Sequence, residues 1–273
     1  MLGGNVETVS NEDEIHSLKN NKIVGEPNIQ NSNIIFHGTD NVLYCENKVN
    51  IVGSTITFKG NNALIYLSST NSNYTMYTQT SHNSLLYIGK ENNIVPRINI
   101  NAQEHKNVII GDDGTISSNV SIRTTDAHSF YNVNTKKRIN QSGSVYIGDH
   151  VFLGHNAYIE KGVKIGSGSI IENNAHVNSN AVLQSNCYYS GDPVKLLEKD
   201  VFFTKDYPAN YDEEDTLNAE DYKSNVFIFD NTSGDALDAN KIDAILSNFS
   251  VSEKIDFIHK LFVQNKKQNR FSI

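Results

Sequence analysis

His128 is the residue of this chain whose type and setting best fit acid–base chemistry. A histidine titrates near neutral pH, so it can act as a general base without a strongly perturbing environment. Asp126, two residues earlier, could accept a hydrogen bond from the imidazole ring and fix its tautomer. A single histidine in a loop is more often a solvated surface residue, so both interpretations stay open on these residues alone.

A short basic run, Lys136-Lys137-Arg138, follows His128 at close range. One interpretation is a solvated run of charges. The other is a local basic patch that binds an anionic acceptor or a coenzyme phosphate, in a chain whose formal net charge is −8. The two interpretations differ in whether these side chains contact a ligand.

These residues interrupt a repeat of period six. Large apolar residues recur every six positions at Ile147, Leu153, Ile159, Ile165, Ile171, Val177, Leu183 and Tyr189. Four positions after each of the first seven comes a small or β-branched residue: Val151, Ala157, Val163, Ser169, Ala175, Ala181 and Cys187. A helix needs apolar spacing near 3.6 and a strand pair needs alternation. A period of six instead predicts a coil of short parallel strands whose corners favour glycine and asparagine.

The interruption itself is long. The repeat runs upstream through Ile110, Ile116 and Ile122, and the spacing from Ile122 to Ile147 then exceeds four hexapeptides by one position. Residues 123–144 show no period of six, so we predict that they form a loop extruded from the coil. A long insertion in a regular solenoid is usually functional or disordered, and this one contains His128 and the basic run.

The segments before the regular repeat are predicted to extend it. Residues 1–27 are polar and acidic and are expected to form a short helix or a frayed arm. Residues 28–108 repeat similar apolar segments at 21-residue intervals, beginning at Asn41, Asn62 and Asn83. This spacing indicates wider, less regular coils of the same solenoid, and a separate β-sandwich is the alternative.

The regular core is predicted over residues 109–195, and a tail with two helices over residues 196–273. Ile242, Ile245, Leu246 and Phe249 mark the apolar face of the first helix, and Ile255, Ile258, Leu261 and Phe262 mark that of the second. Ser250 and Glu253 have the spacing of a capping box for the second helix. The apolar stripes could cap the solenoid or contact a partner subunit.

Composition excludes several classes of protein. The net charge of −8 argues against a general nucleic-acid surface. No run of 18 apolar residues occurs, so no membrane span is expected. The N-terminus lacks a secretory signal pattern. Cys45 and Cys187 form neither a metal nor a redox motif, and Cys187 occupies an inward position where burial is expected. These features predict a soluble cytoplasmic protein.

Residues 109–195 resemble the hexapeptide-repeat acyltransferases, and more narrowly the nodulation, galactoside and maltose O-acetyltransferase group. The shared blocks follow in the family's order: Thr125-Asp126-Ala127-His128, Lys137-Arg138-Ile139-Asn140, residues 145–154, Gly162-Val163 and Gly191-Asp192-Pro193-Val194-Lys195. The first block is most similar to the capsular polysialic-acid O-acetyltransferases. The resemblance implies an all-β fold, a left-handed parallel β-helix with irregular N-terminal coils and a C-terminal helical tail.

The resemblance also implies roles for individual residues. His128 matches the family's general base, which takes a proton from an acceptor hydroxyl as it attacks the thioester of acetyl-CoA. Phe152 stands where many members carry an aromatic residue near the pantetheine arm, often tryptophan, which this chain lacks. Pro193 matches a position near the adenine and Lys195 one near the nucleotide phosphates. Val194 departs from the alanine common between them.

The expected activity is O-acetylation of a sugar hydroxyl in a bacterial surface polysaccharide or its precursor. Coenzyme A lies between neighbouring subunits in the family, so a homotrimer is implied. The oxyanion of the tetrahedral intermediate needs a donor, for which we expect the backbone N–H of Gly154 or Ala157. No metal is expected.

Three alternatives remain. One is N-acetylation of a nucleotide-linked amino sugar by the same base. A second is a zinc enzyme like the γ-carbonic anhydrases, in which His128 and His155 would be ligands and Glu160 would stand where the third histidine is expected. The third is a carbohydrate-binding solenoid without catalysis. Outside the zinc interpretation, His150 and His155 are expected to be turn residues that face solvent or lie near the acceptor.

Overall fold

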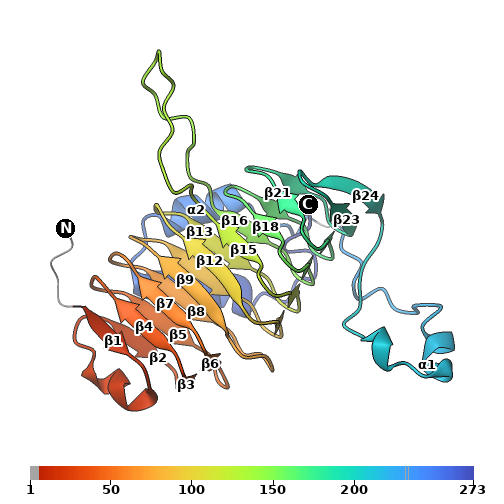
Figure 1. Cartoon of the computed structure of the whole chain (residues 1–273), viewed down its shortest axis with the longest axis horizontal. Coiled ribbons are helices and arrows are strands. Elements are labelled where there is room, and N and C mark those ends of the chain that lie inside the picture. The colour runs from red at the N-terminus through yellow and green to blue at the C-terminus, as the bar shows by residue number, and fades with distance from the viewer. Residues whose placement is uncertain (1–5, 231, 233) are drawn as a thin grey trace.

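Two sheets of stacked strands run the length of the solenoid (Figure 1), and shorter sheets form its third side. The structure is a computed structural model that describes residues 6–230, 232 and 234–273. The first sheet contains β1 (Glu7–Val9), β4 (Asn33–Phe36), β7 (Thr55–Phe58), β9 (Met76–Thr80), β12 (Ile98–Ala102), β15 (Ser121–Arg123), β18 (Tyr158–Ile159) and β21 (His176–Val177). The second contains β2 (Lys22–Val24), β5 (Val42–Cys45), β8 (Leu64–Leu67), β10 (Leu85–Ile88), β13 (Asn107–Ile110), β16 (Val145–Ile147), β19 (Lys164–Ile165) and β22 (Val182–Leu183).

The third side of the solenoid is built from shorter elements. One sheet contains β11 (Asn93–Ile94), β14 (Thr115–Ile116), β17 (Phe152–Leu153), β20 (Ile170–Ile171), β23 (Cys187–Ser190) and β24 (Lys195–Lys199). β3 (Asn28–Gln30) and β6 (Asn50–Val52) form a separate parallel pair. Among the described residues, the paired strands are parallel except β1 with β4 and β23 with β24, at the two ends of the solenoid. The predicted hexapeptide-repeat solenoid is confirmed.

The period of six sets the geometry of the regular coils. Tyr146, Lys164 and Val182 pair in succession, so each regular coil consists of three hexapeptides. The inward residues of the repeat, such as Leu153 and Ile171, are buried. The corners adopt positive φ at intervals of six: His150 (52°), Asn156 (60°), Gly162 (74°), Gly168 (75°), Asn174 (59°), Asn180 (64°) and Asn186 (51°). Asparagine and glycine recur there because they tolerate this conformation best.

The upstream coils are wider but belong to the same solenoid. Leu43, Ile65, Leu86 and Val108 pair in succession, each separated from the next by more than the three hexapeptides of a regular coil. Their side chains join one apolar core that continues to Tyr189. The alternative of a separate β-sandwich is therefore wrong. Cys45 and Cys187 are both buried and unbridged.

The N-terminal segment is part of the first coil rather than an arm. β1 pairs with β4, a 3-10 helix covers Glu12–Ser17, and β2 pairs with β5. The Glu7 carboxylate accepts hydrogen bonds from the backbone N–H groups of Lys19 and Asn20 at 2.8 and 3.2 Å. Of the two alternatives expected for residues 1–27, the structure shows the short helix rather than the frayed arm from Glu7 onward, and residues 1–5 lie outside the described part.

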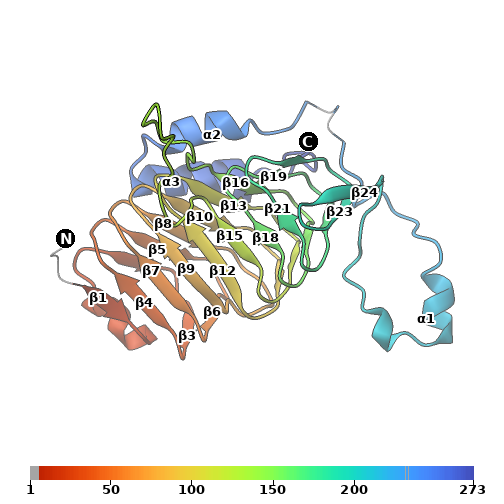
Figure 2. The same ribbon diagram turned by 45° about the horizontal axis from the view of Figure 1, so that its top comes forward.

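The C-terminal helices pack on their own chain, over the outer face of the second sheet (Figure 2). They are α2 (Ala239–Leu246) and α3 (Val251–Ile258), and α3 continues into a π-helical turn (His259–Val263). The predicted capping box is present, with Ser250 and Glu253 bonded reciprocally. Phe262 stacks on Tyr87 with ring centroids 5.1 Å apart.

An arm over residues 201–229 projects from the end of the solenoid after β24 (Figure 1). It contains a short 3-10 helix (Pro208–Asn210) and α1 (Glu213–Asn218), whose N-cap is Asp212. The acidic composition of this stretch gave no periodic signal, so α1 was not expected. Within the described residues, no helix is long and apolar enough to cross a membrane.

Candidate active site

A hairpin leaves the solenoid between β15 and β16 (Figure 1). His128 lies at its base, where Asn140 bonds to its main-chain oxygen. The two arms of the hairpin are joined by backbone hydrogen bonds from Ile139 N–H to Phe130 O and from Asn132 N–H to Lys137 O, both 2.9 Å long. Tyr131 and Arg138 form an antiparallel bridge. The excursion is therefore an ordered projection from one corner of the coil.

Asn140 fixes the base of this hairpin. Its side chain is buried and makes four hydrogen bonds. It donates to the carboxylate of Asp126 (2.7 Å) and to the main-chain oxygen of His128 (2.8 Å). It accepts from the N–H of Phe130 (2.7 Å) and from Nε of Arg138 (3.3 Å). One buried amide thus holds both sides of the loop.

The His128 ring borders an open pocket of about 510 Å³. Within the described part of the chain, the ring forms no hydrogen bond, so both nitrogens remain available to a ligand. The pocket is lined by Arg123, Asp126, Ala127, His128, Phe130, Ile139, Asn140, Glu160, Lys161 and Ser179. Polar, charged and apolar side chains therefore surround the imidazole.

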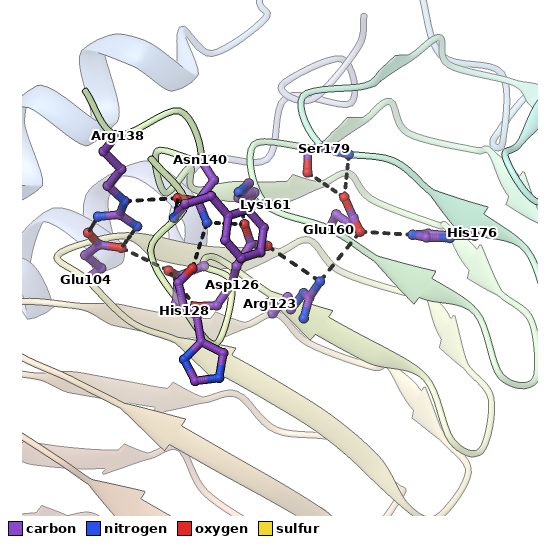
Figure 3. Close-up of polar contacts among 12 residues, drawn as sticks. Glu104, Arg123, Asp126, His128, Arg138, Asn140, Glu160, Lys161, His176 and Ser179 are labelled. Carbon is purple, nitrogen blue, oxygen red and sulfur yellow. Dashed lines mark hydrogen bonds and ion pairs between the residues drawn. The ribbon is translucent and has the colours of Figure 1, made fainter. Parts of the chain in front are cut away.

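Asp126 is engaged away from the His128 ring. Its carboxylate forms an ion pair with Lys161, which is 7% exposed, and it accepts a hydrogen bond from Asn140. Burial raises the pKa of Asp126, but the hydrogen bonds from Lys161 and Asn140 outweigh it and hold the pKa below its usual range. Figure 3 shows the imidazole pointing away from this carboxylate. The expectation that Asp126 orients the ring is therefore wrong in this arrangement.

A chain of charged side chains continues from Asp126 across the first sheet (Figure 3). Arg123 Nη2 lies 3.6 Å from Asp126 and 3.6 Å from Glu160. Glu160 accepts hydrogen bonds from Ser179 and lies 3.1 Å from His176 Nε2. Burial raises the pKa of Glu160, yet these bonds hold it below its usual range. His176 Nδ1 in turn lies 3.0 Å from Asp192, beside Pro193.

The residues of the zinc hypothesis do not converge within this chain. Glu160 is bonded to Ser179 and His176, and His155 Nδ1 lies 2.8 Å from Ser118 Oγ. No group of three or more His, Cys, Asp or Glu side chains that could hold a metal occurs among the residues the structure describes.

The basic run divides into a tether and two exposed side chains. Arg138 forms a bidentate ion pair with Glu104, with Nη2 donating to Oε2 at 2.9 Å. These hydrogen bonds lower the pKa of Glu104 to about 2. Lys136 and Lys137 are exposed near the tip of the hairpin. Arg138 is therefore bound internally, whereas the two lysines are available.

Phe152 belongs to a different pocket from His128. It lies on β17 of the third sheet, beside the ring of Phe203 at 5.6 Å, and borders a pocket of about 280 Å³. That pocket is lined by Phe152, Ile170, Glu172, Asn173 and Tyr188 and shares no residue with the pocket of His128. Pro193 is exposed in the turn between β23 and β24, and Lys195 is exposed as the first residue of β24.

The two expected oxyanion donors are already hydrogen-bonded. The N–H of Gly154 donates to Ile171 O at 2.8 Å, and the N–H of Ala157 donates to Gly154 O at 3.0 Å. Stacking of the coils engages the first N–H and a turn within one coil engages the second, so neither N–H is free to bind a ligand. The expectation that Gly154 or Ala157 stabilises an oxyanion is wrong for this reason.

His150 is a corner residue, as expected, but it does not face solvent. It is 1% exposed and lies between Phe203 and Phe227, with ring centroids 4.2 and 3.7 Å away. Its Nδ1 lies 2.8 Å from the Asp113 carboxylate, and its Nε2 lies 2.8 Å from Phe203 O. His150 therefore anchors the projecting arm and is no part of the His128 pocket.

Sequence reasoning missed the roles of four polar residues of the site. Arg123 and Lys161 were not singled out, Asn140 appeared only within a shared block, and Glu160 only as a possible zinc ligand. A signal for two of them was present in the repeat. Ile122 and Ile159 occupy the same inward position on paired strands, so Arg123 and Glu160, each one residue later, become neighbours on the outer face.

Comparison with known proteins agrees with the repeat. Residues 144–179 match the family described as bacterial transferase hexapeptide (six repeats). A polysialic acid O-acetyltransferase of Neisseria meningitidis is 32% identical over 122 residues, which cover 45% of this chain and 56% of that protein. One from Escherichia coli O1:K1 / APEC is 38% identical over 53 residues, covering 19% of this chain and 17% of that protein. The matches thus span less than two thirds of either relative.

Two solved structures share the fold over most of this chain. The polysialic acid O-acetyltransferase OatWY superposes with a TM-score of 0.60 at 25% identity, covering 73% of this chain and 95% of that one. The polySia-specific acetyltransferase NeuO gives a TM-score of 0.59 at 24% identity, covering 73% and 97%. The expected resemblance to hexapeptide-repeat transferases, and to the polysialic-acid O-acetyltransferases among them, is confirmed.

Proposed function

We propose that this protein is an acetyl-CoA-dependent O-acetyltransferase that acts on a sugar hydroxyl of a bacterial surface polysaccharide, such as a capsule, or of its precursor. One observation carries the proposal: Asn140 holds the main chain of His128 while leaving its ring unbonded in an open pocket. The similarity to proteins named polysialic acid O-acetyltransferases supports the reaction class and the kind of acceptor.

His128 would act as the general base. It takes the proton of the acceptor hydroxyl as that oxygen attacks the thioester carbonyl of acetyl-CoA. A carbon–oxygen bond forms, the carbon–sulfur bond breaks, and the proton on His128 passes to the departing thiolate. The acetyl ester and free coenzyme A are the products, and no acyl-enzyme is needed.

Residues of the third sheet and of its last turn would bind acetyl-CoA. Phe152 would pack beside the pantetheine arm, Pro193 near the adenine and Lys195 near the phosphates, as the resemblance implies. Lys136 and Lys137 would attract an anionic acceptor or a coenzyme phosphate from the tip of the hairpin, whereas Arg138 is held by Glu104.

A second copy of the chain would complete each site. His128 lies at the corner after the first sheet, whereas Phe152 lies on the third, in a pocket with no residue in common. The two pockets therefore do not meet within one chain. A homotrimer with cyclic symmetry would join the His128 corner of each subunit to the Phe152 face of the next.

Thiol release from acetyl-CoA, measured with a panel of sialylated and neutral oligosaccharides, tests this proposal. We expect acceptor-dependent release that falls about 10²-fold or more in His128→Ala, the scale of a lost general base. His155→Ala is the matched control, because His155 is also exposed but bonds to Ser118 outside the pocket. Retention of full activity by His128→Ala would remove His128 from the mechanism.

The same assay separates the alternatives. Transfer to a nucleotide-linked amino sugar but to no hydroxyl acceptor would indicate the N-acetyltransferase. Absence of transfer to any acceptor, together with absence of coenzyme A binding, would favour the binding module or the zinc enzyme.

A further inference from the structure

Arg123 forms no hydrogen bond within the described part of the chain, although its guanidinium lies in the His128 pocket. Its closest charged partners, Asp126 and Glu160, are both 3.6 Å away, beyond the usual range for a hydrogen bond from nitrogen to oxygen. Its Nε is buried without any partner. A guanidinium carries five N–H donors, so this side chain has unused capacity beside the candidate base.

The position of Arg123 is nevertheless fixed. Its guanidinium carbon lies 4.9 Å from the centroid of the Tyr158 ring, and the two groups form a cation–π contact. The two flanking carboxylates hold it from either side. The side chain remains 30% exposed, so the guanidinium is placed but not covered. A donor that is held in place loses little conformational freedom when it binds a ligand.

The two carboxylates do not depend on Arg123 for their hydrogen bonds. Asp126 is paired with the buried Lys161 and bonded to Asn140. Glu160 is bonded to Ser179 and lies beside His176. Each carboxylate has closer partners than the guanidinium. Arg123 therefore keeps the N–H donors of its terminal nitrogens unused beside the pocket, where an anion from solution could accept from them.

We propose that Arg123 determines acceptor specificity by binding an anionic oxo group, namely the carboxylate of an acidic sugar, through two parallel hydrogen bonds. The planar fork of a guanidinium matches a carboxylate in this way. The anchored sugar would lie across the pocket with a hydroxyl directed to His128. This inference rests on the proposed acetyl transfer, and it names the chemical group by which that site selects its acceptor.

A phosphate of coenzyme A offers similar oxygens, so the test must separate the two sources. We would compare oligosialic acid with its carboxyl-reduced derivative as acceptors, and measure the KM for acetyl-CoA in parallel. The variants are Arg123→Met and Arg123→Lys. Arg97→Met is the matched control, because Arg97 is also on the first-sheet side but donates to Gly53 O outside the pocket.

We expect Arg123→Met to lower kcat/KM for the acidic acceptor by roughly 10- to 100-fold, the scale of a lost charge-assisted pair. The reduced acceptor should change by less than about 3-fold, because it offers no carboxylate to the guanidinium. Arg123→Lys should fall between wild type and Arg123→Met, since it keeps the charge but loses the fork. Arg97→Met should match wild type.

Two results would overturn the proposal. Equal losses on both acceptors would leave Arg123 with a structural role only. A raised KM for acetyl-CoA with an unchanged KM for the acidic acceptor would assign the anion to the coenzyme.

Calorimetric titration with oligosialic acid measures acceptor binding directly and does not require acetyl transfer. It compares His128→Ala with His128→Ala/Arg123→Met, and we expect binding to weaken at least roughly 10-fold in the double variant. Equal affinities would contradict the role of Arg123. If the wild-type protein transfers no acetyl group, the proposed function fails, while this titration still tests the anion site.

Discussion

The side-chain amide of Asn140 donates a 2.8 Å hydrogen bond to the main-chain oxygen of His128. The same amide nitrogen lies 2.7 Å from the Asp126 carboxylate, and the amide oxygen accepts from the N–H of Phe130. Asn140 is therefore the residue that sets where His128 stands. The backbone of the candidate base is held, while its ring is left free to meet a substrate.

Replacing Asn140 should impair turnover more than cofactor binding. In Asn140→Ala the main chain at His128 loses its donor and the base loses its position, so we expect kcat to fall roughly 10-fold or more. The KM for acetyl-CoA should stay within about 2-fold, since the Phe152 pocket is elsewhere. Steady-state kinetics with both substrates varied checks this. Asn134→Ala, at the exposed hairpin tip, is the control and should match wild type. If Asn140→Ala raised only the KM for a substrate and left kcat unchanged, the positioning role would be contradicted.

Asp126→Asn should affect stability more than chemistry, because the carboxylate neutralises Lys161 rather than orienting His128. Leaving a buried ammonium unpaired should cost about 3 kcal/mol in the free energy of unfolding. Adding Lys161→Met should recover part of this loss. Urea unfolding of the two single variants and the double variant measures the coupling. If the losses of unfolding free energy in the single variants simply added in the double variant, Asp126 and Lys161 would have no interaction energy.

The same carboxylate gives the hairpin base a pH dependence with a definite sign. The pKa of Asp126 is lowered in the folded protein, so its stabilisation is present above the unfolded value, about 4, and is lost as pH falls through the folded value. Wild type should therefore be more stable than Asp126→Asn at neutral pH, and this advantage should shrink only under acid conditions. Unfolding at pH 3 and pH 7 checks this; an equal difference at both would be contrary to the cause given.

Glu104→Gln and Arg138→Met should have matching effects, because each removes the same ion pair. We expect both to loosen the hairpin and to lower kcat by a similar factor, with no further loss in the double variant. Hydrogen exchange of residues 129–139 and acceptor kinetics measure the two effects. If Arg138 instead bound the acceptor directly, Arg138→Met would raise the acceptor KM whereas Glu104→Gln would not.

Mixing two impaired variants should restore activity if each site draws on two subunits. His128→Ala and Phe152→Ala would be combined under conditions that allow subunit exchange. Random assortment in a cyclic trimer leaves roughly a quarter of the sites intact at equal mixing, so activity should rise well above that of either variant. The unexchanged mixture is the control. Without recovery after verified exchange, both residues would have to act within one chain.

Burial of Lys254 should make the protein more stable as pH rises into the alkaline range. This side chain is buried on α3, donates to Asn62 O and Asn83 O at 2.8 and 2.9 Å, and burial lowers its pKa to about 8. The unfolded side chain keeps its proton up to about pH 10, so the unfolded state binds more protons between these values and stability rises with pH. Wild type should gain roughly 1–2 kcal/mol over Lys254→Met between pH 7 and 9.5. Lys260→Met, on an exposed side chain, should show no such trend.

Much of the fold follows from local spacing. The period of six predicts the inward residues from Ile147 to Tyr189, and its interruption predicts an extruded loop where the structure has the hairpin. The spacing of Ser250 and Glu253 likewise located the start of α3. These predictions succeed because each depends on residues close in sequence or on a fixed repeat.

The site was harder to predict because its contacts join different coils. Asp126 was expected to meet its near neighbour His128, but stacking brings it to Lys161, 35 residues away. Arg138 was expected either to be solvated or to bind a ligand, yet it meets Glu104 across the base of the hairpin. His150 was expected at the surface, but the aperiodic arm supplies Phe203 and Phe227 to cover it.

The corners at intervals of six restrict how this solenoid can change in length. Each coil of the regular part consists of three hexapeptides, and inserting a shorter segment within a coil would rotate every later side chain off its face. Additions are therefore confined to complete coils or to loops that leave and re-enter at one corner. The hairpin with His128 is of the second kind. The pocket could thus be remodelled by exchanging this loop, while the number of coils is altered independently beneath it.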